Sequence, residues 1–164
     1  MNETVTIRLA KQAMKFSAAH FTIFSASERE RLHGHNFRVE VDIEAHMLGN
    51  GMCFDYGIYK DTVIALCREL NEWMILPTRS PYLQIEEQGE HVIAVFNGQR
   101  IPFLRADVLL LPIENVTLEE FAAHFLTRLT ADRDELRQHR IRAIDVRVFS
   151  GPGQSAGRRL RVDP

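Results

Sequence analysis

Residues Asn36 to Ala45 read N-F-R-V-E-V-D-I-E-A, so apolar and polar side chains alternate along the segment. Because successive side chains of a β-strand point to opposite faces of a sheet, this alternation predicts a strand with one buried face. A similar alternation predicts an earlier strand from Val5 to Phe16. The polar loop from Ser25 to Arg31 separates the two segments. We therefore expect the two strands to pair as a long antiparallel hairpin.

Two helices are expected after this hairpin. Asp55 can cap the first, which should end near Trp73, because apolar residues between Tyr59 and Leu70 recur at helical spacing. A possible capping box, Thr117-Leu118-Glu119-Glu120, begins the second helix. The apolar residues that this second helix places on one side are Phe121, Phe125, Leu126 and Leu129.

Three further segments complete the prediction. Prolines at positions 77 and 81 and the polar run 86–90 predict a loop after the first helix. Asn97-Gly98 lies between two extended runs, 92–96 and 99–103, and both residues tolerate the positive φ of a type I′ turn, so a β-hairpin is expected. A last strand is expected from Ile141 to Phe149, after which Gly151-Pro152-Gly153 should turn the chain into an arginine-rich tail.

This order of elements predicts an α+β fold. We expect an antiparallel four-stranded sheet with two helices packed on one face, and an extra β-hairpin insert between Pro77 and Pro112. A length of 164 residues with 45% hydrophobic content suffices for one buried core, so residues 1–164 are expected to form a single domain.

Composition also narrows the function classes. The formal net charge of -2 comes from well-mixed acids and bases, which argues against a nucleic-acid partner. No apolar run approaches the length of a membrane span, and the N-terminus lacks the pattern of a secretory signal. We therefore expect a cytoplasmic protein without a membrane partner, in which Cys53 and Cys67 are reduced thiols in the interior.

Three histidines form the strongest chemical signal. His33 and His35 are two residues apart at the start of the predicted second strand, so both rings project from one face. His20 lies directly across the hairpin. Three neutral imidazoles that leave a fourth position open are typical of catalytic zinc, which then acts as a Lewis acid. The alternative is a set of ordinary histidines near a turn. No convergence is expected for the other four, His46, His91, His124 and His139.

Two segments, Phe16-Ser17-Ala18-Ala19-His20 and Leu32-His33-Gly34-His35-Asn36-Phe37, resemble the zinc motif of the 6-pyruvoyl-tetrahydropterin synthase family. This family has relatives in queuosine and folate synthesis. The likeness extends through Gly51-Met52-Cys53-Phe54-Asp55-Tyr56 and continues weakly at 117–119 and 151–156. It implies the tunnelling fold, in which three such sheets close into a barrel and two barrels stack as a hexamer. A homo-oligomer, either a trimer or a dimer of trimers, is therefore expected.

The resemblance also implies a site. Zinc would be held by His20, His33 and His35, a reduced pterin would be the substrate, and Thr117 and Glu119 would contact it. Most members carry a cysteine base four residues before the H-G-H motif, but this position is Arg29.

Glu30, three residues before His33, resembles a branch of the family in which glutamate replaces the cysteine. In that branch the enzyme cleaves dihydroneopterin, or its triphosphate, to a 6-hydroxymethyl pterin. A carboxylate beside the metal could take the proton whose loss starts a retro-aldol cleavage. The alternative is that Glu30 belongs to the solvated run from Ser27 to Arg31.

Two positions depart from the pattern of the family. The Asp-His proton relay expected after Leu70 is replaced by Asn71 and Glu72, and Glu72 could stand in for it. An acidic residue that grips the pterin ring is expected at the end of the last strand, where the sequence has Phe149 and Ser150. A charge-assisted hydrogen bond to the ring would thereby be lost.

We predict a zinc-dependent lyase that acts on the side chain of a dihydropterin, with Glu30 and Glu72 as catalytic residues. A second hypothesis is a degenerate member that binds zinc and a pterin-like or purine-like ligand without lyase chemistry. A third, a structural zinc module, is weaker because structural sites normally use four ligands. The tail arginines 158, 159 and 161 could contact a substrate triphosphate, although such runs are more often solvated.

Overall fold

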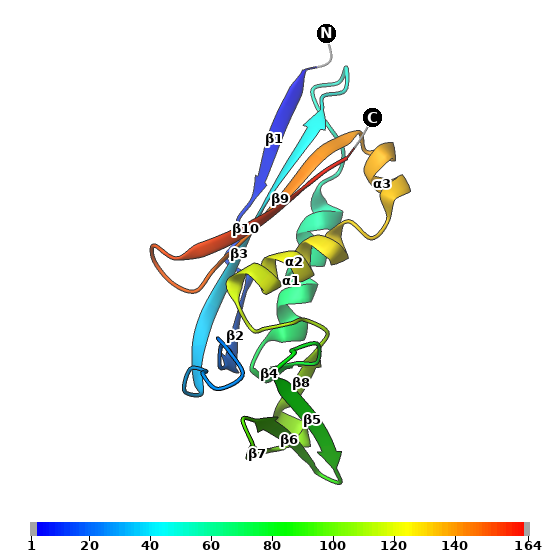
Figure 1. The fold of residues 1–164 in the computed structure, drawn as a ribbon. Coiled ribbons are helices and arrows are strands. Elements are labelled where there is room, and N and C mark those ends of the chain that lie inside the picture. The colour runs from blue at the N-terminus through cyan, green and yellow to red at the C-terminus, as the bar shows by residue number, and fades with distance from the viewer. Residues whose placement is uncertain (1–2, 163–164) are drawn as a thin grey trace.

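The computed structural model describes residues 3–162 (Figure 1). Its central strand is β3 (His33–His46). Along one edge of β3 lie β1 (Thr4–Leu9) and β2 (Lys15–His20), both antiparallel to it, which confirms the predicted pairing. The expected continuous strand from Val5 to Phe16 is wrong, because the chain turns between β1 and β2. In that turn the Met14 N–H donates to the Lys11 carbonyl at 2.9 Å.

The other edge of β3 pairs with β9 (Ile141–Phe149), as predicted, and β9 pairs with β10 (Ser155–Arg161). The sequence predicts only an arginine-rich tail after the turn, so β10 is a correction. The strand lies at the end of the sheet and leaves its arginines exposed. Arg159 forms an ion pair with Glu44 of β3 at 2.7 Å. An edge strand that needs only one hydrogen-bonding side accommodates such charged residues.

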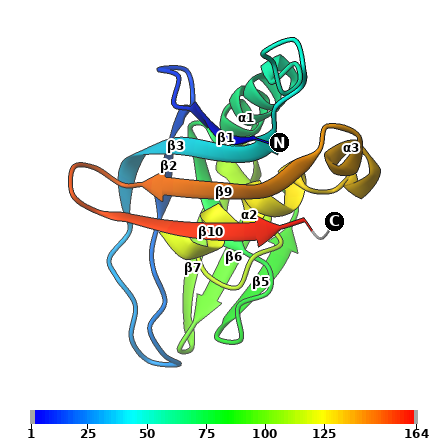
Figure 2. The same cartoon turned by 90° about the horizontal axis from the view of Figure 1, so that it is seen from above.

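Helices α1 (Gly57–Leu70) and α2 (Leu118–Leu129) pack on one face of the sheet, as predicted (Figure 2). The side chain of Thr117 caps α2 by accepting a hydrogen bond from the Glu120 N–H at 3.3 Å. α1 ends at Leu70 and not near Trp73, because Glu72 has a φ of 65° and donates its N–H to the Ser17 carbonyl. The short helix α3 (Arg133–Gln138) is a further element that the sequence did not predict.

The main core lies between these helices and the sheet. Phe16 of β2, Phe37 of β3 and Phe121 of α2 are all buried and form a cluster of rings. The centroid of the Phe121 ring lies 5.2 Å from that of Phe16 and 5.0 Å from that of Phe37. Cys53 and Cys67 are both free and buried, as predicted.

The sheet is larger than the four antiparallel strands predicted. β4 (Trp73–Pro77) runs parallel to β2, and β8 (Val108–Leu111) runs parallel to β4. Four of the five residues of β4 are buried, so the strand is a continuous apolar run. Such a run has no alternation to mark it as a strand.

The predicted insert forms a second, three-stranded sheet of β5 (Leu83–Gln88), β6 (His91–Phe96) and β7 (Gln99–Leu104). The Asn97-Gly98 hairpin is confirmed, with φ values of 48° and 72°. β5 replaces the loop expected after the first helix. A 3-10 helix, η1 (Arg105–Asp107), follows β7. This sheet lies at the end of the molecule away from both termini and packs with Phe21 and Ile23 in a second core (Figure 1).

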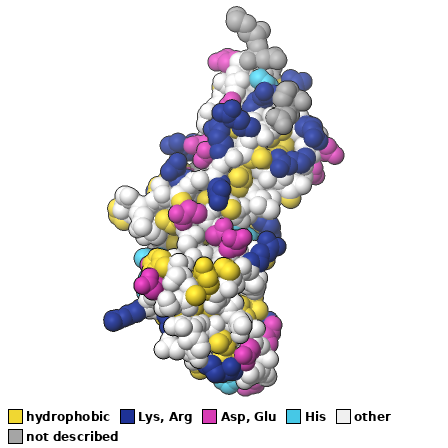
Figure 3. Space-filling model, in the orientation of Figure 1, with side chains coloured by type: hydrophobic (Ala, Val, Ile, Leu, Met, Phe, Trp, Pro, Cys, Tyr) yellow, Lys and Arg dark blue, Asp and Glu magenta, His cyan; other side chains and the backbone are white. Residues whose placement is uncertain are grey.

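Acidic and basic side chains are interspersed on the face of the molecule shown in Figure 3, which agrees with the mixed charge pattern of the sequence. None of the helices within residues 3–162 is long and apolar enough to cross a membrane.

Candidate active site

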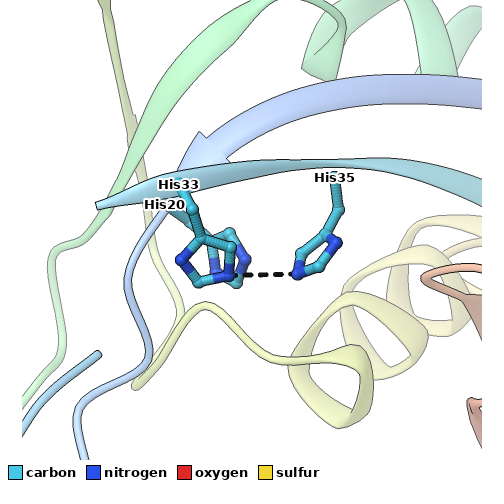
Figure 4. A group of neighbouring side chains, drawn as sticks. All are labelled: His20, His33 and His35. Carbon is cyan, nitrogen blue, oxygen red and sulfur yellow. Dashed lines mark hydrogen bonds between the residues drawn. The ribbon is translucent and has the colours of Figure 1, made fainter. Parts of the chain in front are cut away.

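The hairpin brings three histidines together. His20, the last residue of β2, pairs with His33, the first of β3, while His35 pairs with Ala18. Residues two apart on a strand share a face, so the rings of His33 and His35 lie on the same side of β3 (Figure 4). One ring nitrogen from each histidine lies within 4.8 Å of those of the other two. The ring nitrogens of the three histidines therefore lie close together, as the spacing of the histidines in the sequence predicts.

Backbone carbonyls orient two of the rings. The Nδ1 atom of His20 lies 3.0 Å from the Val116 carbonyl, and the Nδ1 atom of His33 lies 2.6 Å from the Arg31 carbonyl. Because a carbonyl only accepts hydrogen bonds, each Nδ1 carries the proton and leaves a lone pair on Nε2. This arrangement is typical of metal-binding histidines.

Two of the Nε2 atoms form a hydrogen bond with each other, and the third has no partner among the residues that the structure describes (Figure 4). The Nε2 atoms of His33 and His35 are 3.0 Å apart. The Nε2 atom of His20 is buried and has no hydrogen-bond partner within residues 3–162. Burial lowers the pKa of His20, and this effect outweighs the hydrogen bond to Val116, which raises it. A neutral, buried imidazole nitrogen without a partner suits coordination of a cation, because leaving it unpaired is costly.

A pocket of about 550 Å³ opens beside the histidines. Its lining includes the predicted residues Glu30, Thr117 and Glu119. The hydroxyl of Thr117 already caps α2, whereas Glu119 is exposed in the first turn of that helix. The structure therefore brings six of the seven predicted site residues to one cavity.

Glu30 lies at the edge of this histidine cluster. Its Oε2 atom accepts a hydrogen bond from the Thr22 N–H at 3.0 Å and lies 3.8 Å from Nε2 of His33. Partial burial raises the pKa of Glu30, but the hydrogen bonds from Thr22, together with His33 and His20, lower it further than burial raises it. The net result is a pKa below the ordinary value, so Glu30 is a carboxylate at neutral pH.

Glu72 is the predicted residue that the structure does not bring to the histidines. It lines a different cavity together with Ser17, Asn36 and Asp107. Ser17 and Asn36 alternate with the residues that face the core, so this cavity lies on the opposite face of the sheet. Neighbouring Asn71 has a structural role, because its Oδ1 accepts the Ser17 N–H at 2.9 Å.

Sequence reasoning missed two residues at the site, Asn115 and Val116. Asn115 holds the backbone of Ile23 through both of its amide atoms, and Val116 orients His20. Ser150, where the resemblance implies an acidic residue, and Gln154, within the weakly similar segment 151–156, do line the pocket, with Oγ of Ser150 3.3 Å from Oε1 of Gln154. No local pattern marks Asn115 and Val116, because each contacts a residue more than 90 positions away in the sequence.

Comparison with known proteins places this site in a family. Residues 9–159 match the family described as 6-pyruvoyl tetrahydropterin synthase. A Methanocaldococcus jannaschii protein, provisionally named 6-carboxy-5,6,7,8-tetrahydropterin synthase, is 28% identical over 144 residues, which cover 87% of this chain and 88% of that protein. A Pyrococcus horikoshii protein with the same provisional name is 28% identical over 151 residues and covers 92% of this chain and 88% of that protein.

Solved structures support the same family. The 6-pyruvoyl tetrahydropterin synthases of Plasmodium vivax and Plasmodium falciparum each superpose with a TM-score of 0.92 at 26% sequence identity, covering 98% of this chain and 100% of theirs. Two further Plasmodium vivax structures, with a TM-score of 0.91 and the same identity and coverage, carry alanine or cysteine in place of a glutamate described as a catalytic residue. Together with the match over residues 9–159, these likenesses show that the chain has the tunnelling fold and belongs to the 6-pyruvoyl tetrahydropterin synthase family.

Proposed function

We propose that this protein is a zinc-dependent lyase that acts on the side chain of a dihydropterin, either dihydroneopterin or its triphosphate. Membership of the family supports processing of a pterin side chain. The observation that carries the zinc proposal is the buried Nε2 of His20, which has no hydrogen-bond partner in the described part of the chain and lies with the ring nitrogens of His33 and His35 within 4.8 Å. These three nitrogens would hold the ion, and zinc bound there would supply a Lewis acid for a substrate oxygen.

Glu30 would accept the proton from the substrate side chain. Its carboxylate shares the pocket with the histidines and is fixed by the Thr22 N–H. A base must lie within hydrogen-bonding reach of the proton that it removes, and the position of Glu30 in the same pocket as the histidines supports this role. A glutamate is also the residue described as catalytic in the Plasmodium vivax enzyme.

Thr117 and Glu119 would bind the pterin from the first turn of α2. Both line the cavity on the side of the α2 N-terminus. A carboxylate such as Glu119 can accept hydrogen bonds from ring N–H groups, and these bonds are stronger when one partner is charged.

A catalytic role for Glu72 would require a second copy of the chain to bring it to these histidines. A homo-oligomer, as a trimer or a dimer of trimers, and a cytoplasmic location belong to the same proposal.

A second candidate function is binding of zinc and a pterin-like or purine-like ligand without lyase chemistry. One specific observation favours it, since the wall formed by Ser150 and Gln154 carries no charge. A neutral wall holds an amino-pyrimidine ring more weakly than a carboxylate does.

The zinc proposal is tested by metal analysis of the purified protein. We expect about one zinc per chain, lost on dialysis against a chelator and in a His33→Ala variant. Protein that contains no zinc and gains none on incubation with the ion would refute it.

The catalytic proposal is tested with Glu30→Gln, using Glu28→Gln as a matched control in the same loop. Both proteins are incubated with dihydroneopterin, its triphosphate and carboxypterin precursors, and the products are identified by mass spectrometry. Glu30→Gln should retain zinc and lose at least about 100-fold in turnover, within the range for loss of a general base. Glu28→Gln should match the unaltered protein. Tight ligand binding without any product in the unaltered protein would favour the second candidate.

A further inference from the structure

Arg29, which stands where most relatives are expected to carry a cysteine, is turned toward the three-stranded sheet. The centre of its guanidinium group lies 4.9 Å from the centroid of the Phe21 ring and 5.7 Å from that of the Phe96 ring. Phe21 follows β2 and Phe96 ends β6, and both rings are almost completely buried. A cation over two aromatic faces is attracted by the negative charge density of each ring.

The same guanidinium group also contacts the backbone of the next residue. Nη1 of Arg29 donates a hydrogen bond to the carbonyl of Glu30 at 2.8 Å. Arg29 thus links a buried ring of the three-stranded sheet to the main chain of Glu30. A planar guanidinium group suits this position, because it can stack on rings and donate in its own plane at once.

The loop that carries Glu30 is held on its other side by the segment that follows β2. The Glu30 N–H donates to the Thr22 carbonyl at 2.8 Å, and the Thr22 N–H donates to the Glu30 carboxylate. Ile23 and Arg29 form an isolated antiparallel bridge beside them. These bonds align the loop with the residues that follow β2. The contact with the three-stranded sheet is made by Ile23, which packs in the second core, and by Arg29 with the rings on which it rests.

We propose that the three-stranded sheet β5–β6–β7 positions Glu30 beside the histidines, and that Phe96 and Arg29 transmit this support. Phe96 and Arg29 are positioning residues, since neither lines the pocket of the histidines. The inference rests on the proposed function for the role of Glu30 in turnover, although the contacts themselves do not depend on it.

The test uses Arg29→Met, which keeps the aliphatic stem, and Phe96→Leu, which keeps most of the apolar volume. Arg29→Lys serves as a rescue variant, because a lysine retains the charge above the rings. Val92→Ala is the matched control: Val92 is a buried residue of the same strand, near its opposite end.

The first readout is hydrogen exchange of the backbone amides of Thr22 and Glu30 in metal-free protein. We expect both amides to exchange at least about 10-fold faster in Arg29→Met and in Phe96→Leu, with partial recovery in Arg29→Lys and no change in Val92→Ala. Equal acceleration in Val92→Ala would overturn the proposal, because general loosening of the sheet would then explain the effect. Unchanged exchange in Arg29→Met would overturn it too.

The second readout separates kcat from KM. Misplacement of a catalytic group by about 1 Å can cost on the order of 100-fold in rate, so Arg29→Met and Phe96→Leu should lower kcat about 10- to 100-fold with little change in KM or zinc content. The double variant should lose little more kcat than either single variant, because both substitutions interrupt the same set of contacts. Full activity in Glu30→Gln would refute the proposed function, and the exchange data would still decide the inference. If exchange is altered but kcat is unchanged, while Glu30→Gln is inactive, the inference is overturned and the proposed function stands.

Discussion

Replacement of Asn115 by alanine should destabilise the protein at the junction between the histidine site and α2. Asn115 is half-buried, and its side chain takes part in three hydrogen bonds. Nδ2 donates to the Ile23 carbonyl at 2.7 Å, while Oδ1 accepts the N–H groups of Ile23 at 3.1 Å and Val116 at 3.0 Å. Alanine would leave these three partly buried backbone groups without partners.

The expected loss follows from the number of bonds. Each intramolecular hydrogen bond contributes about 0.5–1.5 kcal/mol net, so three bonds amount to about 1.5–4.5 kcal/mol. Water can reach some of the freed groups, because they are only partly buried, which places the expected loss at about 2–3 kcal/mol. For a chain of this length each kcal/mol lowers Tm by about 2–4 °C, so Tm should fall by about 4–12 °C.

The assay is urea denaturation of metal-free protein followed by circular dichroism. Asn50→Ala is the control, since Asn50 is exposed and, among residues 3–162, its Oδ1 accepts a single hydrogen bond, from the Met52 N–H at 3.2 Å. That variant should lose less than about 0.5 kcal/mol. Because Val116 also orients His20, Asn115→Ala should weaken zinc binding about 10- to 100-fold in competition with a chelator. A stability loss below about 1 kcal/mol, or one equal to that of the control, would refute the reasoning.

Two further predictions concern the core and the response to pH. Phe121→Ala should cost about 3–5 kcal/mol of unfolding free energy in urea, because the fully buried ring contacts Phe16 and Phe37; a loss below about 2 kcal/mol would contradict the packing. Burial, and then Arg128, lower the pKa of His124, so the folded state binds fewer protons than the unfolded state. Its stabilising contribution is complete above the unfolded pKa of about 6.5 and falls as the pH drops through 6.5 toward the folded value. Urea curves at pH 7.5 and 5.5 should therefore show a smaller loss on acidification in His124→Gln, and an equal loss would count against this assignment.

Much of the histidine site could be inferred from local pattern. The alternation along β3 and the two-residue spacing of His33 and His35 depend only on the period of a strand. Pairing with β2 then places His20 opposite His33, so a hairpin alone brings the rings together. The type I′ turn at Asn97-Gly98 could also be predicted from the local sequence, because these residues adopt positive φ readily.

Strands without alternation could not be predicted in this way. β4 is buried on both faces and has no polar side to mark it. β10 is rich in arginine, yet it pairs because β9 offers it a free edge. In both cases a neighbour from elsewhere in the chain, and no pattern within the strand, determines the structure.

By itself, the sequence determined the alternation of β3, the helical faces that cover the sheet and the shared face of His33 and His35, because short-range periodicity dictates which side chains lie together. Only the tertiary structure decided that Glu72 lies across the sheet from the histidines, and that Arg29 rests on Phe21 and Phe96. These outcomes depend on how distant elements pack. Local sequence does not determine in which direction the chain continues after a turn such as the one at Glu72.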